Sequence, residues 1–159
     1  MLPLKPIYDR REIVTTLKSK DPDETYELGR KYAEKAYPGE VIALDGDLGC
    51  GKTVFAKGFA DGLGVKEPVT SPTFTILRQY DEGRLPLYHF DVYRIESSDE
   101  MFETGFDEYI TGDGVCLIEW AENVRDILPD DTIWIKIKKN EDDSFESRLI
   151  EISGGKKDI

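Results

Sequence analysis

The amino-acid sequence predicts a single α/β domain in which helices flank a mixed central β-sheet that includes antiparallel hairpins. Its 159 residues can bury one substantial core but are too few for two ordinary domains. Residues Val41–Ala56 combine an apolar strand, a glycine-rich turn and the start of a helix. Val115–Ile118 is a continuous apolar run, as expected of a strand buried on both faces. Thr132–Lys138 alternates cleanly and Ser147–Ile152 returns after a turn, which predicts a half-buried hairpin.

The N-terminal part predicts an edge strand followed by a helix. Arg11–Lys18 is rich in β-branched residues and roughly alternating, which favours a short strand at a sheet edge. Asp21 has the properties of an N-cap, with Pro22 at the first helical position and Glu24 completing a capping box. The buried stripe of this helix recurs at helical spacing and stops before Pro38; its members are Thr25, Leu28, Gly29, Tyr32, Ala33 and Ala36.

The middle of the chain predicts a helix and a first hairpin. The helix covers Thr53–Asp61, and we expect Gly62 and Gly64 to terminate it. The strand-like runs Phe74–Tyr80 and Leu85–Val92 surround a short polar turn and therefore predict a hairpin.

The remaining segments complete one domain. A helix start at Ser97 leads into a short acidic helical region that extends to about Tyr109. The second hairpin turns at Asn140–Asp143. We assign residues 1–153 to the domain and expect residues 154–159 to form a disordered tail.

Composition limits the classes of partner. The formal net charge of -12 repels the nucleic-acid backbone, so the sequence argues against direct, extensive binding of RNA or DNA. The two cysteines, Cys50 and Cys116, suggest neither a disulfide framework nor a zinc site. Cys50 is expected to be a small filler, with a redox-sensitive thiol as the alternative. Because no apolar run is long enough for a signal peptide or a membrane span, we expect a cytoplasmic protein without membrane contact.

A phosphate-binding motif carries the first functional prediction. Residues Gly46–Thr53 fit G-x-x-x-x-G-K-[ST] at every fixed position, between a strand and a helix as the motif requires. The glycines allow successive backbone N–H groups to face one anion, and the helix that begins near Gly51 adds the positive end of its dipole. Lys52 is expected to reach the outer phosphates and Thr53 to ligate magnesium. The sequence therefore predicts nucleotide binding.

Two acidic strand ends are candidates for a catalytic or metal-binding carboxylate. The runs that end in Asp91 and in Glu119 each lead from apolar residues into an acid, and such acids face the ligand crevice of α/β sheets. Either could hold the carboxylate that a phosphate loop needs for hydrolysis. Thr70–Thr73 offers hydroxyls where a segment sensing the terminal phosphate would lie, or forms only a proline-containing turn. His89, the single histidine, is either packed in the core or catalytic.

The identity of the base is less clear from the residues. The guanine-reading N-K-x-D signature is absent, and the one D-x-x-G match, Asp61–Gly64, falls at the end of the predicted helix, so ATP is favoured. Trp120 either belongs to the core or closes over the nucleotide. A charge-stabilising arginine could be among Arg78, Arg84 and Arg94, although nothing ranks Arg78 or Arg84 above solvated surface.

Four motifs together resemble a known family. Gly46–Thr53, Thr70–Phe74, His89–Arg94 and Leu117–Trp120 occur in the order and spacing of the TsaE (YjeE) family of bacterial ATPases, which act in threonylcarbamoyladenosine modification of tRNA. The resemblance covers about residues 21–153. It implies a P-loop NTPase-like domain with weak intrinsic hydrolysis of ATP to ADP. It also implies action with TsaD and TsaB, without transfer of the threonylcarbamoyl group by this chain and with tRNA reached only through the complex.

The resemblance also implies roles for single residues. Lys52 would bind the β- and γ-phosphates, and Thr53 and Glu119 would hold Mg²⁺. Asp91 would lie beside the metal, directly or through water, and help orient the nucleophile, so that Lys52, Asp91 and Glu119 form the catalytic set. Contacts with the nucleotide would come from Gly46, Asp47, Leu48, Gly49, Cys50, Gly51, Lys52, Thr53, Val54, Thr73 and Trp120, with Glu24 and Thr25 near the adenine or ribose and Arg148 as a further candidate. The family often has alanine where this chain has Cys50.

Two other functions remain open on the sequence alone. A small-molecule kinase could be built on the same phosphate loop, with the Arg78–Arg94 region covering an acceptor. A nucleotide-sensing module could use its ATP state to set assembly, with hydrolysis incidental.

Overall fold

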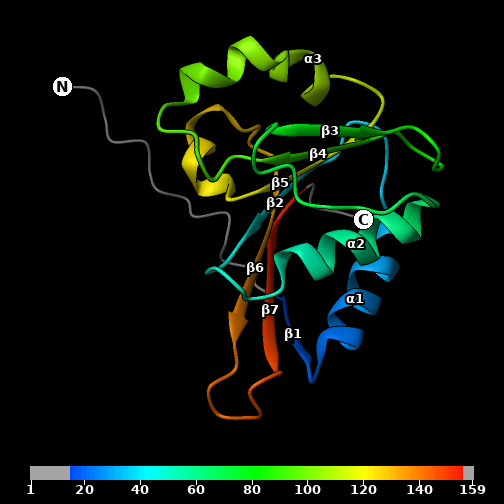
Figure 1. Ribbon diagram of the computed structural model, residues 1–159, viewed down its shortest axis with the longest axis vertical. Coiled ribbons are helices and arrows are strands. Elements are labelled where there is room, and N and C mark those ends of the chain that lie inside the picture. The colour runs from blue at the N-terminus through cyan, green and yellow to red at the C-terminus, as the bar shows by residue number, and fades with distance from the viewer. Residues whose placement is uncertain (1–14, 156–159) are drawn as a thin grey trace.

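The computed structural model describes residues 15–155, which form one seven-stranded mixed β-sheet with helices on both faces (Figure 1). The strand order is β1-β7-β6-β2-β5-β4-β3. The strands are β1 Thr15–Ser19, β2 Val41–Asp45, β3 Leu77–Tyr80, β4 Leu87–Asp91, β5 Val115–Glu119, β6 Ile133–Lys139 and β7 Arg148–Gly154. The predicted α/β class with a mixed sheet and two antiparallel hairpins is confirmed.

The four central strands are parallel, and this fixes where the site lies. Strand β2 pairs in parallel with β5 and β6, and β4 pairs in parallel with β5. The outer strands β3, β7 and β1 are antiparallel to their neighbours. The carboxyl ends of β2, β4, β5 and β6 therefore meet at one edge. In the register of β4 and β5, Asp91 lies opposite Glu119, while Leu44 of β2 lies opposite Glu119 on the other side.

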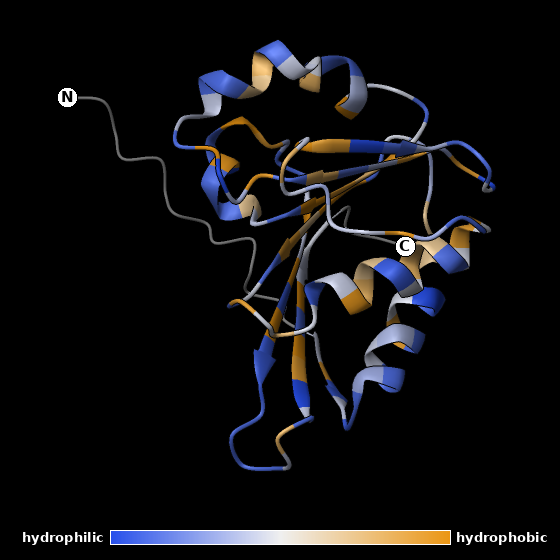
Figure 2. Cartoon of the chain, viewed as in Figure 1, coloured by the Kyte–Doolittle hydropathy of each residue, from blue (hydrophilic) through white to orange (hydrophobic). Residues whose placement is uncertain are grey.

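Two layers of helices cover the sheet. On one face α1 (Pro22–Glu34) and α2 (Lys52–Leu63) pack on the strands through a core that includes Phe55, Phe59 and Ile135. On the other face a second core contains Phe90, Met101 and Phe106. It lies beneath the 3₁₀ helix η2 (Ser98–Thr104), α3 (Phe106–Ile110) and the 3₁₀ helix η3 (Ala121–Ile127). Figure 2 shows hydrophobic residues concentrated along the central strands and hydrophilic residues on the helices that cover them.

The predicted start of α1 is confirmed, with one change in its hydrogen bonds. Asp21 is the N-cap and accepts from the Glu24 backbone N–H at 2.9 Å, with Pro22 at the first helical position. The Glu24 carboxylate accepts from the backbone N–H of Lys20 at 2.8 Å, one residue before the partner that a capping box uses. Both bonds satisfy backbone donors at the helix start.

The prediction that Gly62 terminates α2 is wrong. The helix continues to Leu63, and Gly64 alone ends it, with φ +96° and its N–H bonded to the Ala60 carbonyl. Gly62 faces the backbone of α1, where a Cβ would collide with the Arg30 carbonyl. The absent side chain therefore permits close packing of the two helices, and sequence alone does not distinguish this use from a helix end.

Several strand boundaries also differ from the predictions. Strand β3 begins at Leu77 and not at Phe74, because Ile76 has a left-handed backbone with φ +68°, which interrupts an extended strand. Strand β7 includes Gly154, which we had assigned to the tail; residues 156–159 and the first part of the predicted strand Arg11–Lys18 lie outside the described residues. None of the helices between residues 15 and 155 has the length and apolar character needed to cross a lipid bilayer.

Candidate functional site

The phosphate-loop motif forms the turn from β2 into α2. Gly46 and Gly51 have φ of +148° and +111°, a backbone that glycine adopts without strain. A Cβ on Gly46 would also collide with the Ile137 carbonyl. Gly51 is the N-cap of α2, and no side chain caps this 12-residue helix. The first N–H groups of α2 therefore remain directed toward the loop, as an anion site requires.

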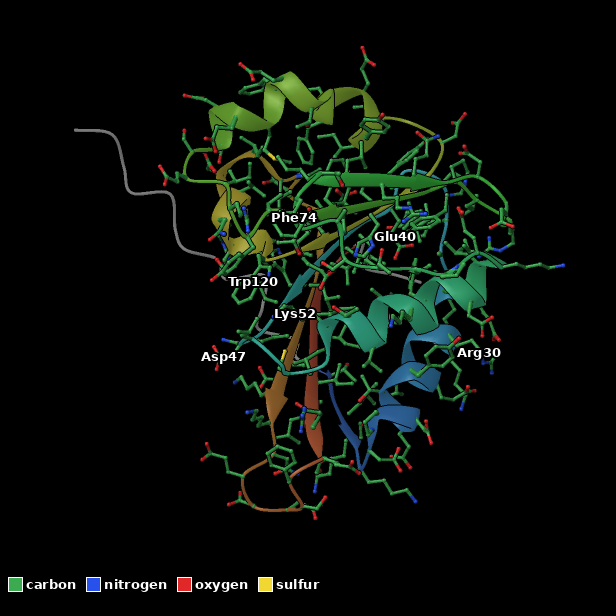
Figure 3. The ribbon with its side chains drawn as sticks, viewed as in Figure 1. Arg30, Glu40, Asp47, Lys52, Phe74 and Trp120 are labelled. Atoms are coloured by element: carbon green, nitrogen blue, oxygen red, sulfur yellow. The ribbon has the colours of Figure 1, made fainter. Side chains whose placement is uncertain are left out.

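Lys52 lies buried at the start of α2 and is held against the loop (Figure 3). Its Nζ donates to the carbonyl of Gly46 at 2.5 Å and to that of Asp47 at 3.0 Å. The same atom lies 3.9 Å from the centroid of the Trp120 ring, a cation–π contact. The structure thus brings Trp120 and Lys52 together, as the sequence predicted for two residues of one site.

Trp120 owes this position to an unusual backbone conformation. Its φ is +63°, in the left-handed region that residues other than glycine seldom adopt. Its backbone N–H donates to the Leu44 carbonyl at 3.1 Å, and its ring packs on Tyr93 at a centroid distance of 4.8 Å. These contacts turn the chain after β5 so that the indole lies over the phosphate loop.

Asp91 and Glu119 form a buried pair of carboxylates at the same sheet edge, with exposed fractions of 3% and 2%. The Ser71 hydroxyl lies between them, 2.5 Å from Asp91 Oδ2 and 3.2 Å from Glu119 Oε2. Thr73 donates to Asp91 Oδ2 at 3.1 Å, and the Tyr93 backbone N–H donates to Asp91 Oδ1 at 3.0 Å. These donors hold the Asp91 carboxylate in one orientation.

Glu119 also connects this pair to the phosphate loop. The Thr53 hydroxyl on the first turn of α2 donates to Glu119 Oε1 at 3.4 Å. The Nε2 atom of His89 lies 2.7 Å from the other carboxylate oxygen, Oε2. Residues from the loop helix, β4, β5 and the Thr70–Thr73 segment therefore meet at one place.

The segment before β3 is held in place by its backbone. The Ile76 N–H donates to the Pro72 carbonyl at 2.7 Å, and the Asp91 N–H donates to the Ile76 carbonyl at 2.8 Å. The strained backbone at Ile76 thus folds the segment back against the end of β4. The segment Thr70–Thr73 includes a proline at a turn, and its hydroxyls at positions 71 and 73 face the carboxylates. A role in sensing the terminal phosphate stays a prediction.

Asp45 is a third buried acid at this edge, and the sequence reasoning missed it. It ends β2 and is 8% exposed, and its Oδ2 atom has no hydrogen-bond partner within residues 15–155. Burial, reinforced by the charge of Glu122, raises the pKa of Asp45 from 3.8 to about 6. The run Val41–Asp45 has the same pattern, apolar residues leading into an acid, that identified Asp91 and Glu119, so the signal was present.

Other predicted site residues surround the back of the loop. The Arg148 guanidinium donates through Nε to the Cys50 carbonyl at 2.8 Å. Thr25 is buried beside Gly51, and its hydroxyl lies 2.7 Å from that of Ser19. Glu24 caps α1, and a role of Glu24 and Thr25 at the adenine or ribose stays a prediction.

The Cys50 thiol is buried beneath the loop, 3.8 Å from the Lys52 ammonium. Burial raises the pKa of Cys50 above its usual range even though the Lys52 charge acts in the opposite direction. A thiol with a raised pKa and little exposure is a weak nucleophile, which favours the filler interpretation over redox sensitivity.

The three arginines have different surroundings. Arg84 donates to the carbonyls of Ala33 and Ala36 at 2.8 and 3.0 Å, so it holds the end of α1 and is not solvated surface. Arg78 lies 3.8 Å from the Glu67 carboxylate, and Arg94 stacks on the ring of Phe74 at 4.4 Å. None of these contacts involves the phosphate loop.

A groove of about 870 Å³ lies beside the phosphate loop. It is lined by Asp45–Asp47, Trp120 and side chains of β6. Within residues 15–155, no group of three or more His, Cys, Asp or Glu side chains is arranged to hold a metal ion. Magnesium commonly uses one or two carboxylates together with substrate phosphates and water, so a site of that type does not need such a group.

Comparison with known proteins identifies the family. The model of the protein family "Threonylcarbamoyl adenosine biosynthesis protein TsaE" matches residues 19–150 of this chain. The chain belongs to the TsaE family. A Bacillus subtilis protein named tRNA threonylcarbamoyladenosine biosynthesis protein TsaE is 52% identical over 126 residues, which cover 79% of this chain and 78% of that protein. A Treponema pallidum protein of the same name is 45% identical over 120 residues, 76% of this chain and 88% of that protein.

A solved structure extends the TsaE family likeness to the fold. The crystal structure of Bacillus subtilis YdiB superposes with a TM-score of 0.78 at 40% sequence identity and covers 91% of this chain and 87% of that one. The resemblance inferred from the four motifs is therefore confirmed at the level of family and fold.

Proposed function

We propose that this chain is a magnesium-dependent, ATP-hydrolysing subunit that supports threonylcarbamoyladenosine modification of tRNA. The observation that carries the proposal is the contact of Thr53, at the start of the phosphate-loop helix, with Glu119 of the buried carboxylate pair. This contact places a hydroxyl and a carboxylate of the kind that hold magnesium beside a loop suited to phosphates.

The residues present fit a nucleoside triphosphate with magnesium. The loop glycines leave room for backbone N–H groups to face an anion, and α2 begins there without a side-chain cap. Thr53 and Glu119 would hold the metal, with Asp91 beside them. Bound magnesium would supply positive charge against the phosphate oxygens. Nothing in the fit identifies adenine, so the preference for ATP rests on the absent guanine signature and on the family.

Different side chains of this chain would have different roles in hydrolysis. Lys52 would exchange the loop carbonyls of Gly46 and Asp47 for phosphate oxygens and neutralise charge as it develops. Asp91 would accept a hydrogen bond from the attacking water and orient it in line with the bond that breaks. Ser71 and Thr73 hold the Asp91 carboxylate in place through Oδ2. Trp120 would restrict access of bulk water on the side of Lys52.

Partner proteins enter the proposal through the family and the surface. The relatives are named for tRNA threonylcarbamoyladenosine biosynthesis, but a net charge of -12 disfavours extensive tRNA contact by this chain itself. Three apolar side chains near the loop and the carboxylates are exposed, Leu48 at 79%, Phe74 at 82% and Tyr93 at 53%, and such surface is typical of protein contacts. We propose that TsaD- and TsaB-type proteins cover it, that hydrolysis is weak in their absence, and that the chain acts in the cytoplasm.

The experiment is reconstitution of tRNA modification with TsaD and TsaB, with ADP release followed in parallel. We expect association that depends on nucleotide and turnover that requires Mg²⁺. Absence of association under every nucleotide condition would exclude the role in the complex. The sensor alternative would be supported if Glu119→Ala and Asp91→Ala bound ATP and sustained full modification after losing hydrolysis.

A further inference from the structure

His89 makes a contact that neither packing nor direct catalysis accounts for. It is the single histidine of the sequence, lies on β4 and is fully buried. Its Nε2 atom is 2.7 Å from Glu119 Oε2, and Glu119 is itself 2% exposed. The imidazole therefore lies behind the carboxylate, on the side away from the Thr53 hydroxyl.

The chemistry of the two groups fixes the direction of this hydrogen bond. An ionised carboxylate can only accept, so His89 donates its Nε2 proton to Glu119. The other ring nitrogen, Nδ1, is buried and has no hydrogen-bond partner among the described residues. Burying an unpaired nitrogen is unfavourable, and a leucine would fill the space without that cost. Compared with an apolar side chain of similar size, the imidazole therefore provides one additional feature, its Nε2–H donor.

This donor controls how the Glu119 carboxylate is oriented. Oε2 receives His89 at 2.7 Å and Ser71 at 3.2 Å, whereas Oε1 faces the Thr53 hydroxyl at 3.4 Å. Ser71 has a single hydroxyl proton and lies closer to Asp91 Oδ2, at 2.5 Å, so His89 is the donor that Oε2 keeps, and rotation of the carboxylate would break its hydrogen bond. The free lone pairs of Oε1 are consequently held toward the start of α2.

We propose that His89 is a positioning residue that holds Glu119 with Oε1 directed at the magnesium position beside Thr53. The inference rests on the proposed function, since it assigns His89 to the support of a metal ligand. Groups that hydrogen-bond a ligand from behind set its orientation, and their loss typically lowers metal affinity or activity by about 10–100-fold.

Two amide substitutions separate the donor at Nε2 from the rest of the ring. The amide nitrogen of His89→Gln can lie near the Nε2 position and donate to Glu119, whereas that of His89→Asn lies near Nδ1, which has no partner. His89→Leu removes both nitrogens. Phe90→Leu serves as a control for general loss of stability, because Phe90 is the next residue of β4 but packs in the opposite core against Phe106.

The readout is the Mg²⁺ concentration at half-saturation in the presence of a non-hydrolysable ATP analogue, followed by intrinsic tryptophan fluorescence. We expect His89→Asn and His89→Leu to raise this midpoint about 10-fold, and His89→Gln and Phe90→Leu to stay within about threefold of wild type. Affinity for the analogue in EDTA should be unchanged in all four variants. Thermal unfolding of each variant shows whether it is folded.

The outcomes distinguish the two levels of the proposal. If wild type responds to Mg²⁺ and His89→Asn has the same midpoint, the positioning role is wrong and the proposed function stands. If His89→Gln behaves like His89→Asn, the donor at Nε2 is not what matters and the role is also wrong. If the wild-type chain shows no Mg²⁺-dependent response to the analogue, the proposed function fails and the role of His89 fails with it.

Discussion

The end of β2 and the neighbouring ends of β4 and β5 carry the same sequence pattern but different chemistry. Each strand leads from apolar residues into a buried acid. Asp91 and Glu119 are surrounded by donors from Ser71, Thr73 and His89. Asp45 lies only one residue beyond the partner of Glu119 in β2, and its Oδ2 atom receives no hydrogen bond from the part of the chain that the structure describes.

The difference teaches that burial of an acid does not by itself indicate a catalytic carboxylate. Donors directed at a buried carboxylate fix its orientation, which metal binding or orientation of water requires. Without enough donors, burial favours the neutral acid, and the pKa of Asp45 rises to about 6 accordingly. The surroundings, rather than the position at the sheet edge, distinguish the two acids that we propose to be functional from Asp45.

Replacement of Glu119 is expected to have the largest effect. Glu119→Gln keeps the size of the side chain but removes the charge that would hold Mg²⁺, so we expect kcat to fall about 10³-fold in the reconstituted complex. The matched acid-to-amide change Asp45→Asn should leave kcat near that of wild type. ADP release at saturating ATP measures both. Equal losses in the two variants would remove the distinction between the two kinds of acid.

Replacement of Asp91 is expected to have the second-largest effect on kcat. The amide of Asp91→Asn is a weaker hydrogen-bond acceptor and a weaker base toward water than a carboxylate. We therefore expect kcat to fall about 10²-fold with little change in ATP affinity. Single-turnover measurements separate the chemical step from binding. A rise in KM with kcat unchanged would show that Asp91 contributes to binding and not to the chemical step.

The same comparison shows how far sequence reasoning reaches. The phosphate loop, the acids at positions 91 and 119 and the two hairpins follow from local patterns, because turn residues and apolar runs are visible in neighbouring residues. The bridge from Ser71 to both acids joins residues 20 and 48 positions apart, and only the register of β4 and β5 brings these acids together. The use of Gly62 for helix packing and the left-handed backbone of Ile76 likewise depend on tertiary contacts.

Removal of the Ser71 hydroxyl tests whether donors on the catalytic pair matter. Ser71→Ala removes the hydroxyl that lies within hydrogen-bond distance of both Asp91 and Glu119, and we expect kcat to fall about 10-fold. Ser144→Ala is the control, because Ser144 is exposed in the β6–β7 turn. Turnover of Ser71→Ala equal to that of the control would mean that the remaining donors suffice to orient both carboxylates.

Asp45 gives the smallest effect, and it should appear in stability. The folded chain holds the Asp45 proton more tightly than the unfolded chain does, since the pKa is raised from 3.8 to about 6. The stabilising contribution of the neutral acid is therefore complete below about pH 4 and is lost as the pH rises through about 6.

Asp45→Asn cannot ionise, so at pH 8 we expect its free energy of unfolding to exceed that of wild type by about 1–3 kcal/mol. At pH 4 the two should agree to within about 0.5 kcal/mol. Urea unfolding at pH 4, 6 and 8 measures this, with exposed Asp142→Asn as the control. A difference independent of pH would mean that the pKa of Asp45 is the same in the folded and the unfolded chain, and the proposed cost of ionising this buried acid would be wrong.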